Sequence, residues 1–174
     1  MPVIRKYTEL APPDAAPVLS FDLPELQYPE RLNAVKTVFD AARENGWSER
    51  TVFYADKQAY TFANVEALVA RSMVALRALD ICHGDVVILR IPDTLELVTT
   101  LLAVQGIGAI AMPTYVQLRA DDLIYRADDA DARLLIASAD LLDEALPVAH
   151  ARRGKTPVVA ISGDPGGRCH KFAD

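Results

Sequence analysis

The chain has 174 residues, of which 51% are hydrophobic and 24% are charged, a composition that excludes an intrinsically disordered protein. Its formal net charge of -6 argues against a nucleic-acid partner, because proteins that neutralise phosphates need an excess of lysine and arginine. A globular chain of this length buries about 70% of its unfolded surface, so it can support a core of its own.

The N-terminus has no apolar segment followed by a small-residue cleavage site, so we expect no secretory signal peptide and a cytoplasmic location. Two cysteines, Cys82 and Cys169, are each followed by a histidine. The long separation of these two pairs does not match a compact zinc site, so we predict no metal ligands. Free thiols also fit a reducing compartment.

Residues 1–50 are predicted to form an extended arm and a first helix. Six prolines in residues 1–29 forbid a long helix there and favour a strap that lies over the surface. Apolar residues at helical spacing then predict a helix over residues 30–45, which Gly46 would end. We expect Trp47, which follows, to pack back against this helix.

Residues 51–174 are predicted to form an α/β subdomain that begins with a β-hairpin. The β-prone runs 51–54 and 58–62 flank a short turn. Thr61 can cap a long helix that ends at Asp80. One face of this helix is predicted to contain Val65, Leu68, Val69, Ser72, Leu76 and Leu79.

The segment 84–115 reads as a strand, a helix and a second strand. A β-branched run at residues 86–91 has the length of a buried strand, and Pro92 and Asp93 stop it. A second apolar strand covers residues 109–112. The helix between them is indicated by the spacing of Leu95, Val98, Leu101, Leu102 and Gln105. Two strands joined by one helix imply a parallel pair with a right-handed crossover.

Two alternatives apply to the middle of this segment. Residues 97–118 carry no charge and are long enough to cross a bilayer, but interior glycines and the absence of flanking basic clusters disfavour a transmembrane helix. Gly106, Gly108 and Ala111 also fit the dinucleotide-binding pattern GxGxxA. That pattern needs a strand leading through the glycines into a helix, whereas here the helix comes first, so we interpret the glycines as a helix end.

The alternation continues with a helix at residues 121–130, a strand at 133–137, a helix at 141–152 and a strand at 157–162. This order predicts an α/β fold, an open, mostly parallel sheet with helices on both faces, to which the β-hairpin, the extended arm and the first helix are attached.

Open α/β sheets bind ligands beyond the carboxyl ends of their strands. The candidate residues at those ends are Pro92, Asp93, Pro113, Thr114, Tyr115, Ala139, Asp140 and residues 163–167. Asp93, Asp140 and Asp164 together would resemble the phospho-acceptor or magnesium site of receiver-like folds. We favour a simpler interpretation, in which each aspartate starts a helix or a turn.

Three further features are interpreted as structural. The glycine-rich loop 163–171 lacks the lysine and the following helix of a P-loop, so we predict an exposed turn. His150 stands near a predicted helix end, where a surface or C-terminal cap residue is more common than a catalytic base. A solvated helix face is predicted for the acidic string Asp121, Asp122, Asp128, Asp129 and Asp131.

Four segments resemble the start of an adenylate-forming acyl-CoA ligase. They are FDLPELQYPERLNAV at residues 21–35, YTFANVEALVARSMVALRALDI at 60–81, HGDVVILRIPDTLELVTTLLAVQGIGAIAMP at 83–113 and RADDLIYRADDADARLLIAS at 119–138. The segment LPELQYPERLN resembles the corresponding sequence in the branch of benzoate-CoA and 2-aminobenzoate-CoA ligases. The later segments resemble the wider superfamily of acyl-CoA synthetases, luciferases and peptide-synthetase adenylation domains.

The resemblance implies an N-terminal fragment of an ATP-dependent aryl-CoA ligase. Such a parent enzyme converts an aryl carboxylate to an acyl-adenylate, uses ATP, magnesium and coenzyme A, and has the remaining portion of the ligase as partner of this chain. The phosphate loop, the adenine and magnesium segment, the ribose-binding aspartate and the C-terminal lysine of the family would all follow Asp174. No catalytic residue is therefore carried over, and we expect the chain alone to be inactive. One departure is that Pro92, Asp93 and Thr94 stand where relatives often have Pro-Asn-Ser.

Two alternatives to an enzyme fragment stay open. One is a free-standing flavodoxin-like or receiver-like binding module that uses strand-end carboxylates such as Asp93 and Asp140. The other is a truncated pseudo-ligase that acts as a partner subunit. The sequence leaves open the aryl acid, a homodimer, and whether a truncation would be natural, engineered or proteolytic. It gives no reason to expect a membrane partner.

Overall fold

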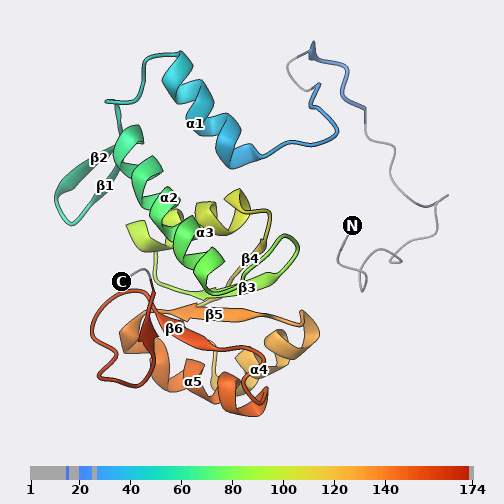
Figure 1. Cartoon of the computed structure of the whole chain (residues 1–174), viewed down its shortest axis with the longest axis vertical. Helices are drawn as coiled ribbons and strands as arrows, with labels where there is room; N and C mark the ends of the chain where they lie inside the picture. Colours follow the sequence, from blue (N-terminus) through green and yellow to red (C-terminus); the bar gives the residue numbers. More distant parts are fainter. Residues whose placement is uncertain (1–14, 16–19, 25–26, 173–174) are drawn as a thin grey trace.

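The computed structural model describes residue 15, residues 20–24 and residues 27–172. Most of the predicted arm falls outside these residues. Its described part is exposed and leads into the first helix (Figure 1). The division of the chain at residue 50 stays a prediction.

Every helix and strand that the sequence predicted is present, in the predicted order. The α-helices of the described part are α1 (Ala34–Glu44), α2 (Phe62–Ala78), α3 (Leu95–Gly106), α4 (Ala120–Asp129) and α5 (Leu142–Ala151). The strands are β1 (Thr51–Ala55), β2 (Gln58–Thr61), β3 (Val86–Arg90), β4 (Ile110–Pro113), β5 (Leu134–Ala137), β6 (Val158–Ala160) and β7 (His170–Lys171). The sequence did not predict β7 or the short 3-10 helix η3 (Ala139–Leu141) that precedes α5.

Local turn and capping chemistry explain the hairpin and the start of α2. Strands β1 and β2 pair antiparallel, and the two turn residues, Asp56 and Lys57, have φ angles of 48° and 65°. Two positive φ angles are what a two-residue type I′ turn requires. The Thr61 side chain accepts a hydrogen bond from the Asn64 backbone N–H, and the Asn64 side chain accepts one from Thr61. This reciprocal capping box confirms Thr61 as the helix cap.

Strands β3 to β7 form one parallel sheet in the order β4-β3-β5-β6-β7. The pairing of β3 with β4 confirms the predicted parallel pair joined by α3. Every residue of the central strands β3 and β5 is buried, as expected for strands covered on both faces. Counted from β3, this is the strand order 2-1-3-4-5 of flavodoxin-like sheets.

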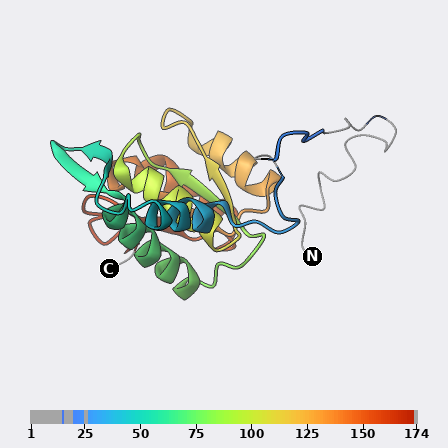
Figure 2. The same ribbon diagram turned by 90° about the horizontal axis from the view of Figure 1, so that it is seen from above.

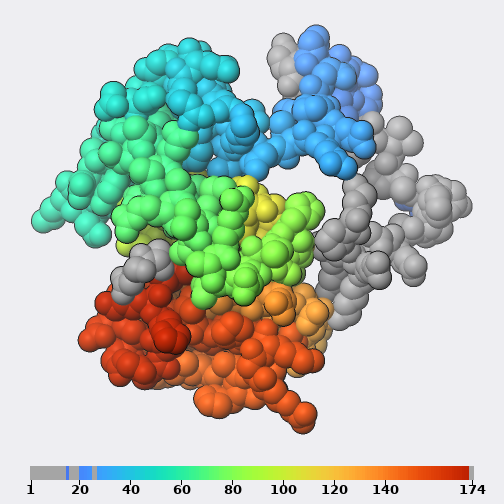
Figure 3. All heavy atoms as spheres, in the orientation of Figure 1, coloured from blue at the N-terminus to red at the C-terminus, as the bar shows by residue number. Residues whose placement is uncertain are grey.

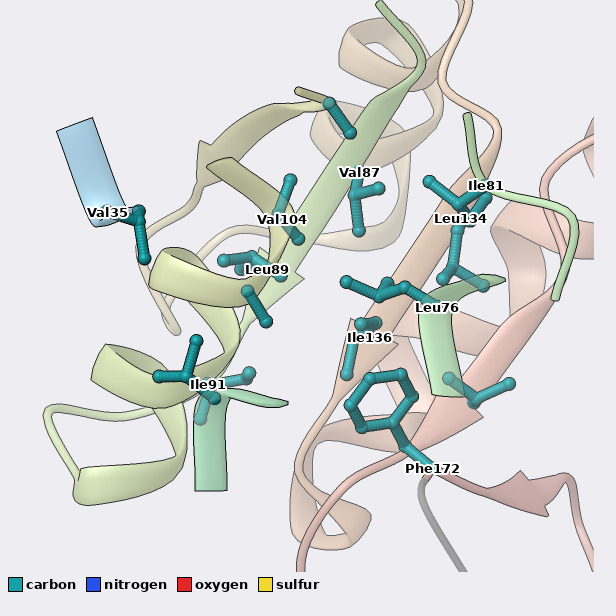
Figure 4. Packing of buried hydrophobic residues seen from close by; sticks show 14 of the residues in the cluster. Val35, Leu76, Ile81, Val87, Leu89, Ile91, Val104, Leu134, Ile136 and Phe172 are labelled. Carbon is teal, nitrogen blue, oxygen red and sulfur yellow. The ribbon is translucent and has the colours of Figure 1, made fainter. Parts of the chain in front are cut away.

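Helices cover both faces of the sheet, which confirms the α/β fold class. Helices α1, α2 and α3 lie on one face, and α4 and α5 lie on the other (Figure 1). Val87 and Leu89 of β3 point into the first core and pack with Leu76 of α2 (Figure 4), whereas Ile88 points into the second core. This alternation is the period of two that a strand imposes on its side chains.

The space-filling view places α2, in green, between α1 and the orange and red segments of the C-terminal part (Figure 3). The hairpin β1–β2 extends beyond the helices and is seen most clearly from above (Figure 2). The hairpin is a separate two-stranded sheet, and its residues Phe53, Ala55 and Tyr60 pack partly buried against the first core.

The buried face of α3 matches its apolar spacing only in part: Leu95 is buried, and Leu101 and Leu102 pack half-buried against the first core. Its buried residues include Thr99, Thr100 and Ala103, whereas Gln105 is exposed and Leu101 is half-buried. The reason is that α3 packs against α2 and α1 as well as the sheet, so its larger apolar side chains spread around the helix and mark no single face.

The uncharged run 97–118 forms most of α3, the strand β4 and the loop after it. Among the described residues, no helix is both long enough and apolar enough to cross a membrane.

Gly46 and Gly108 end α1 and α3, as predicted. Each has a positive φ, of 66° and 81°, in the position just beyond the helix. The Trp47 N–H then bonds to Ala42 O at 2.7 Å, and Ala109 N–H bonds to Val104 O at 3.0 Å, the six-to-one bond of a Schellman motif. Trp47 itself stays 39% exposed, with the Arg50 guanidinium 5.1 Å from its ring centroid.

The other three helices end in the same motif without glycine. Asp80, Asp131 and Arg153 hold the left-handed position after α2, α4 and α5, with φ of 57°, 47° and 51°. Leu79, predicted on the buried face of α2, is instead the C-cap residue and is 40% exposed. No glycine marks the end of α2 at residues 79–81, so the predicted end of this helix, at Asp80, was too late.

The prediction of an exposed turn for residues 163–171 is wrong at its C-terminal end. His170 and Lys171 form β7, which pairs in parallel with β6, and Phe172 beyond it is 6% exposed in the first core. Parallel strands are usually joined by a dozen or more residues, often a helix. The connection between β6 and β7, residues 161–169, is shorter and contains no helix, so the sequence did not indicate a further parallel strand.

Candidate functional site

The carboxyl ends of β3 and β4 enclose a cavity of about 410 Å³, which we call the strand-end cavity. It is lined by residues 91–93, by Leu97 and by residues 113–117. Its volume lies in the range of small-molecule sites. The predicted strand-end residues of β3 and β4 thus come together in one place.

The strand-end cavity lies beside the point where the chain changes direction across the sheet. From β3 the chain runs through α3 to β4 on one face, whereas from β5 it runs through α5 to β6 on the other. Such a change opens a crevice at the carboxyl ends of the strands, where open α/β sheets bind their ligands. Arg90, the last residue of β3, stands at this point, opposite Ala137 of β5.

Arg90 is a buried residue that sequence reasoning missed. Its side chain is on the α4 and α5 face, and the residue is 2% exposed. The guanidinium donates to the backbone carbonyls of Tyr115 at 3.3 Å and Val116 at 2.8 Å. Burial lowers the pKa of Arg90, against the opposing effect of the Glu144 charge. An arginine inside the apolar run VVILRI was the signal available in the sequence.

Glu144 of α5 holds the same loop from its other end. One carboxylate oxygen accepts from Arg119 Nη1 and the other from the Ala120 backbone N–H, both at 2.8 Å. Ala120 is the first residue of α4, so the carboxylate also lies at the positive end of that helix. The Arg119 hydrogen bond, with smaller help from Ala120, lowers the pKa of Glu144.

The strand-end cavity has the chemistry of a binding site rather than of a proton-transfer site. Among its described lining residues, Asp93 carries the only formal charge, and Thr114, Tyr115 and Gln117 supply neutral polar groups. No nucleophile paired with a base lines it, and such a pair is what covalent catalysis requires.

The three strand-end aspartates occupy separate turns. Asp93 is exposed after β3, and Asp140 is exposed in η3. Asp164 accepts a hydrogen bond from Gly166 N–H at 3.0 Å, which confirms its turn role. Nowhere in residues 20–24 and 27–172 do three or more His, Cys, Asp or Glu side chains gather as a metal site would require.

The cysteine and histidine residues are spread over two regions. Cys82 is exposed, and His83 faces Gly108 at the end of α3. Cys169, together with His150 and His170, lines a second cavity of about 660 Å³ beside α5. Burial raises the pKa of the Cys169 thiol, which disfavours the reactive thiolate. His150 is exposed in the last turn of α5, as predicted.

The acidic string is largely exposed, as predicted, and two of its residues also bind a buried arginine. Asp121 and Asp122 are exposed in the first turn of α4, as predicted. Asp128 and Asp131 are exposed as well, and they bind Arg152 at 2.5 Å and 2.9 Å, while the Arg152 side chain is 6% exposed. This cluster joins the C-terminal ends of α4 and α5 at the edge of the sheet opposite the strand-end cavity.

The glycine-rich loop is fastened by Arg168. Its guanidinium donates to Asp143 at 2.7 Å and to the Ala139 carbonyl at 3.1 Å, at the start of α5. Arg168, a basic residue of this loop, therefore has its partners within the chain.

Comparisons with known proteins agree with this architecture. The family model of AMP-binding enzymes matches residues 39–170. A 3-hydroxybenzoate–CoA/4-hydroxybenzoate–CoA ligase of Thauera aromatica is 29% identical over 140 residues, which are 80% of this chain and 27% of the ligase. A p-hydroxybenzoic acid–AMP ligase of Mycobacterium marinum is 32% identical over 115 residues, 66% of this chain and 16% of that protein.

Solved structures give the same result. The anthranilate CoA ligase AuaEII in complex with anthranoyl-AMP is 27% identical and superposes with a TM-score of 0.64 over 77% of this chain and 26% of its own. A benzoate CoA ligase from Burkholderia xenovorans LB400 shares the fold, with a TM-score of 0.69 over 82% of this chain and 27% of its own at 21% identity.

The chain therefore spans 27% or less of the length of each of these relatives. The resemblance to adenylate-forming aryl-CoA ligases, which the sequence indicated, is confirmed. Because the family model covers more than half of its residues, this chain belongs to the family of AMP-binding enzymes.

Proposed function

We propose that this chain supplies the N-terminal α/β portion of an ATP-dependent aryl-CoA ligase. The whole ligase adenylates an aryl carboxylate with ATP and magnesium and then passes the acyl group to the thiol of coenzyme A. The substrate is an aromatic carboxylate of the benzoate type: benzoate itself, a hydroxybenzoate or 2-aminobenzoate. The 174-residue chain alone contributes the scaffold and no catalytic or metal-binding residue.

The observation that carries this proposal is the family match over residues 39–170 together with the names of the relatives. The Thauera ligase and the Mycobacterium ligase are named for hydroxybenzoates, and the AuaEII structure holds anthranoyl-AMP, the adenylate of 2-aminobenzoate. The strand-end cavity fits a supporting role, since its lining offers binding groups without a nucleophile and base.

ATP–pyrophosphate exchange tests the proposal. We expect the complete reading frame that carries this sequence to exchange label with benzoate, a hydroxybenzoate or 2-aminobenzoate, and the 174 residues alone to show none. Exchange catalysed by the isolated chain would contradict the scaffold role. A complete protein that is inactive with every aryl acid but active with acetate or a fatty acid would contradict the aryl substrate.

Partner and location follow from the same proposal. We infer that the partner of this chain is the remaining portion of the ligase and that the ligase acts in the cytoplasm. The apolar side chains exposed along residues 20–33, Phe21, Leu23, Tyr28 and Leu32, fit burial against that portion. The alternatives are a homodimer and a pseudo-ligase that acts as a partner subunit. Sedimentation of the chain alone tests for a homodimer, and sedimentation of the chain with the remaining portion of the ligase tests for association with that portion.

A second candidate is a flavodoxin-like or receiver-like binding module. The strand order 2-1-3-4-5 favours it, because flavodoxin-like proteins bind their ligand at the same switch point. Against it, Asp93, Asp140 and Asp164 do not form a metal-binding group. Thermal melting with FMN, magnesium or acetyl phosphate tests it, because a ligand bound only by the folded state raises the melting temperature.

A further inference from the structure

Arg90 is a buried cation without an ion-pair partner. It is 2% exposed, its Nε has no hydrogen-bond partner, and none of the ion pairs among the described residues includes it. Arginine is almost never buried to this degree unless it is paired. Burying a charged group costs folding free energy unless the group is paired, so fold stability alone does not favour an arginine at this position.

The donors of Arg90 are used on one loop. We call residues 114–119, between β4 and α4, the cavity loop. Its first half is tied to β3, because Thr114 N–H bonds to Leu89 O at 2.9 Å and the Arg90 fork bonds to the carbonyls of Tyr115 and Val116. Thr114, Tyr115 and Val116 also line the strand-end cavity.

Glu144 ties the second half of the cavity loop to α5. Its two oxygens accept from Arg119 and from the Ala120 N–H, so they fix the point where the loop becomes α4. Between the two anchors, Leu118 N–H bonds to Tyr115 O at 3.2 Å and closes a turn. The loop is therefore held from β3 at one end and from α5 at the other, with charged hydrogen bonds at both.

We propose that Arg90 and Glu144 are positioning residues that hold the cavity loop as a fixed wall of the strand-end cavity. Arg90 acts through the backbone carbonyls and Glu144 through the start of α4. Neither side chain lines the cavity, so both act on its shape rather than on its contents. This positioning role of Arg90 and Glu144 does not depend on whether the whole protein is an aryl-CoA ligase.

Hydrogen exchange of the whole folded chain, read by mass spectrometry, tests this role. Arg90→Met removes the donors and keeps a side chain of similar length. We expect amide exchange in residues 114–120 to accelerate about tenfold, the size of a local opening, while the melting temperature changes by less than about 3 °C. Arg90→Lys should be intermediate, because an ammonium keeps three donors but lacks the planar fork.

Two further variants complete the design. Arg77→Met, at an exposed arginine of α2, is the matched control and should leave exchange in the cavity loop unchanged. Glu144→Gln should accelerate exchange around Ala120 more than around Tyr115, because it releases only the second anchor.

Three outcomes would overturn the proposal. One is an Arg90→Met chain that does not fold, or whose β3 and β5 amides exchange faster in step with the cavity loop, since Arg90 would then be a determinant of global stability. Another is unchanged exchange in residues 114–120. The third is an Arg90→Lys chain that exchanges as fast as Arg90→Met, because then the hydrogen bonds of residue 90 would not set the loop. None of these readouts depends on a substrate, so an inactive ligase leaves the test intact.

Discussion

Arg152 shows how one buried side chain joins two helices. Its guanidinium bonds to Asp128 on α4, to Asp131 just beyond α4 and to Thr156, although it belongs to the end of α5. The cation is buried while both carboxylates stay largely in water, with side-chain exposures of 63% and 89%. The two sides of this cluster should therefore respond differently to substitution.

We expect Arg152→Met to cost about 1 kcal/mol of unfolding free energy, because the two aspartates it leaves behind are already solvated. Asp128→Asn combined with Asp131→Asn should cost more, about 2 kcal/mol, because it leaves a buried cation without an anion. Urea unfolding of the three chains measures the difference. Equal losses, or a larger loss for Arg152→Met, would contradict the asymmetry.

Glu144 supplies a pH-dependent contribution. Because its pKa is lowered in the folded chain, the folded state binds fewer protons than the unfolded state, and the stabilisation is present above the unfolded pKa of about 4.3. It is lost as the pH falls through the lower, folded value.

We therefore expect Glu144→Gln to lower the melting temperature at pH 7 and the difference from the unsubstituted chain to shrink as the pH falls below about 4. Melting curves between pH 7 and pH 3 measure this. Glu49→Gln, at an exposed glutamate for which no ion pair is found within the described residues, serves as the control. A difference that grows toward low pH would have the wrong sign for this interaction.

At the scale of elements, the ends of the helices are set by a shared backbone motif with unequal surroundings. Gly46 and Gly108 occupy the same left-handed position after α1 and α3. A Cβ at Gly46 would meet nothing within 4 Å, whereas a Cβ at Gly108 would lie 2.5 Å from His83 Cδ2. Gly46 is favoured only by its left-handed backbone conformation, whereas Gly108 is also favoured by its close approach to the His83 side chain.

Gly46→Ala should cost about 1 kcal/mol, the strain of a left-handed alanine. Gly108→Ala should cost about 3 kcal/mol, because the contact with His83 adds an overpacking penalty. Chemical denaturation of both variants measures the difference, and His83→Ala in the Gly108→Ala chain should recover most of it. No recovery would show that the crowding comes from elsewhere.

At the scale of the whole molecule, the two cores meet at the sheet, and residues near the end of the described chain complete the first one. Phe172 lies after β7 and packs near Ile136 and Leu76 (Figure 4). The first core thus draws on residues from α1 through to Phe172. Its stability should depend on that last aromatic ring.

Phe172→Ala should cost about 3 kcal/mol, the usual loss for a buried phenylalanine. Phe21→Ala, at a ring that is 50% exposed, should change stability by less than about 0.5 kcal/mol. Thermal or urea unfolding of both variants gives the comparison. Equal effects would mean that Phe172 is not part of the core.

Much of the fold was predictable because local signals agreed with the final structure. The turn at Asp56 and Lys57, the cap at Thr61 and the apolar runs of β3, β4 and β5 each depend on neighbouring residues alone. The family resemblance also depends on short stretches of sequence, and the family match confirms it. Those features could be read without knowing which elements touch.

The remaining features depend on residues far apart in the chain. The burial of Arg90 depends on the loop after β4, to which it is hydrogen-bonded. The pairing of Arg152 with Asp128 depends on the packing of α4 against α5. Strand β7 depends on its pairing with β6. The buried face of α3 was likewise set by helices on more than one side. The sequence by itself determined the elements and the family, since these are local patterns. Only the tertiary structure decided which charges are buried and which loop walls the strand-end cavity, because those depend on contacts that sequence spacing does not encode.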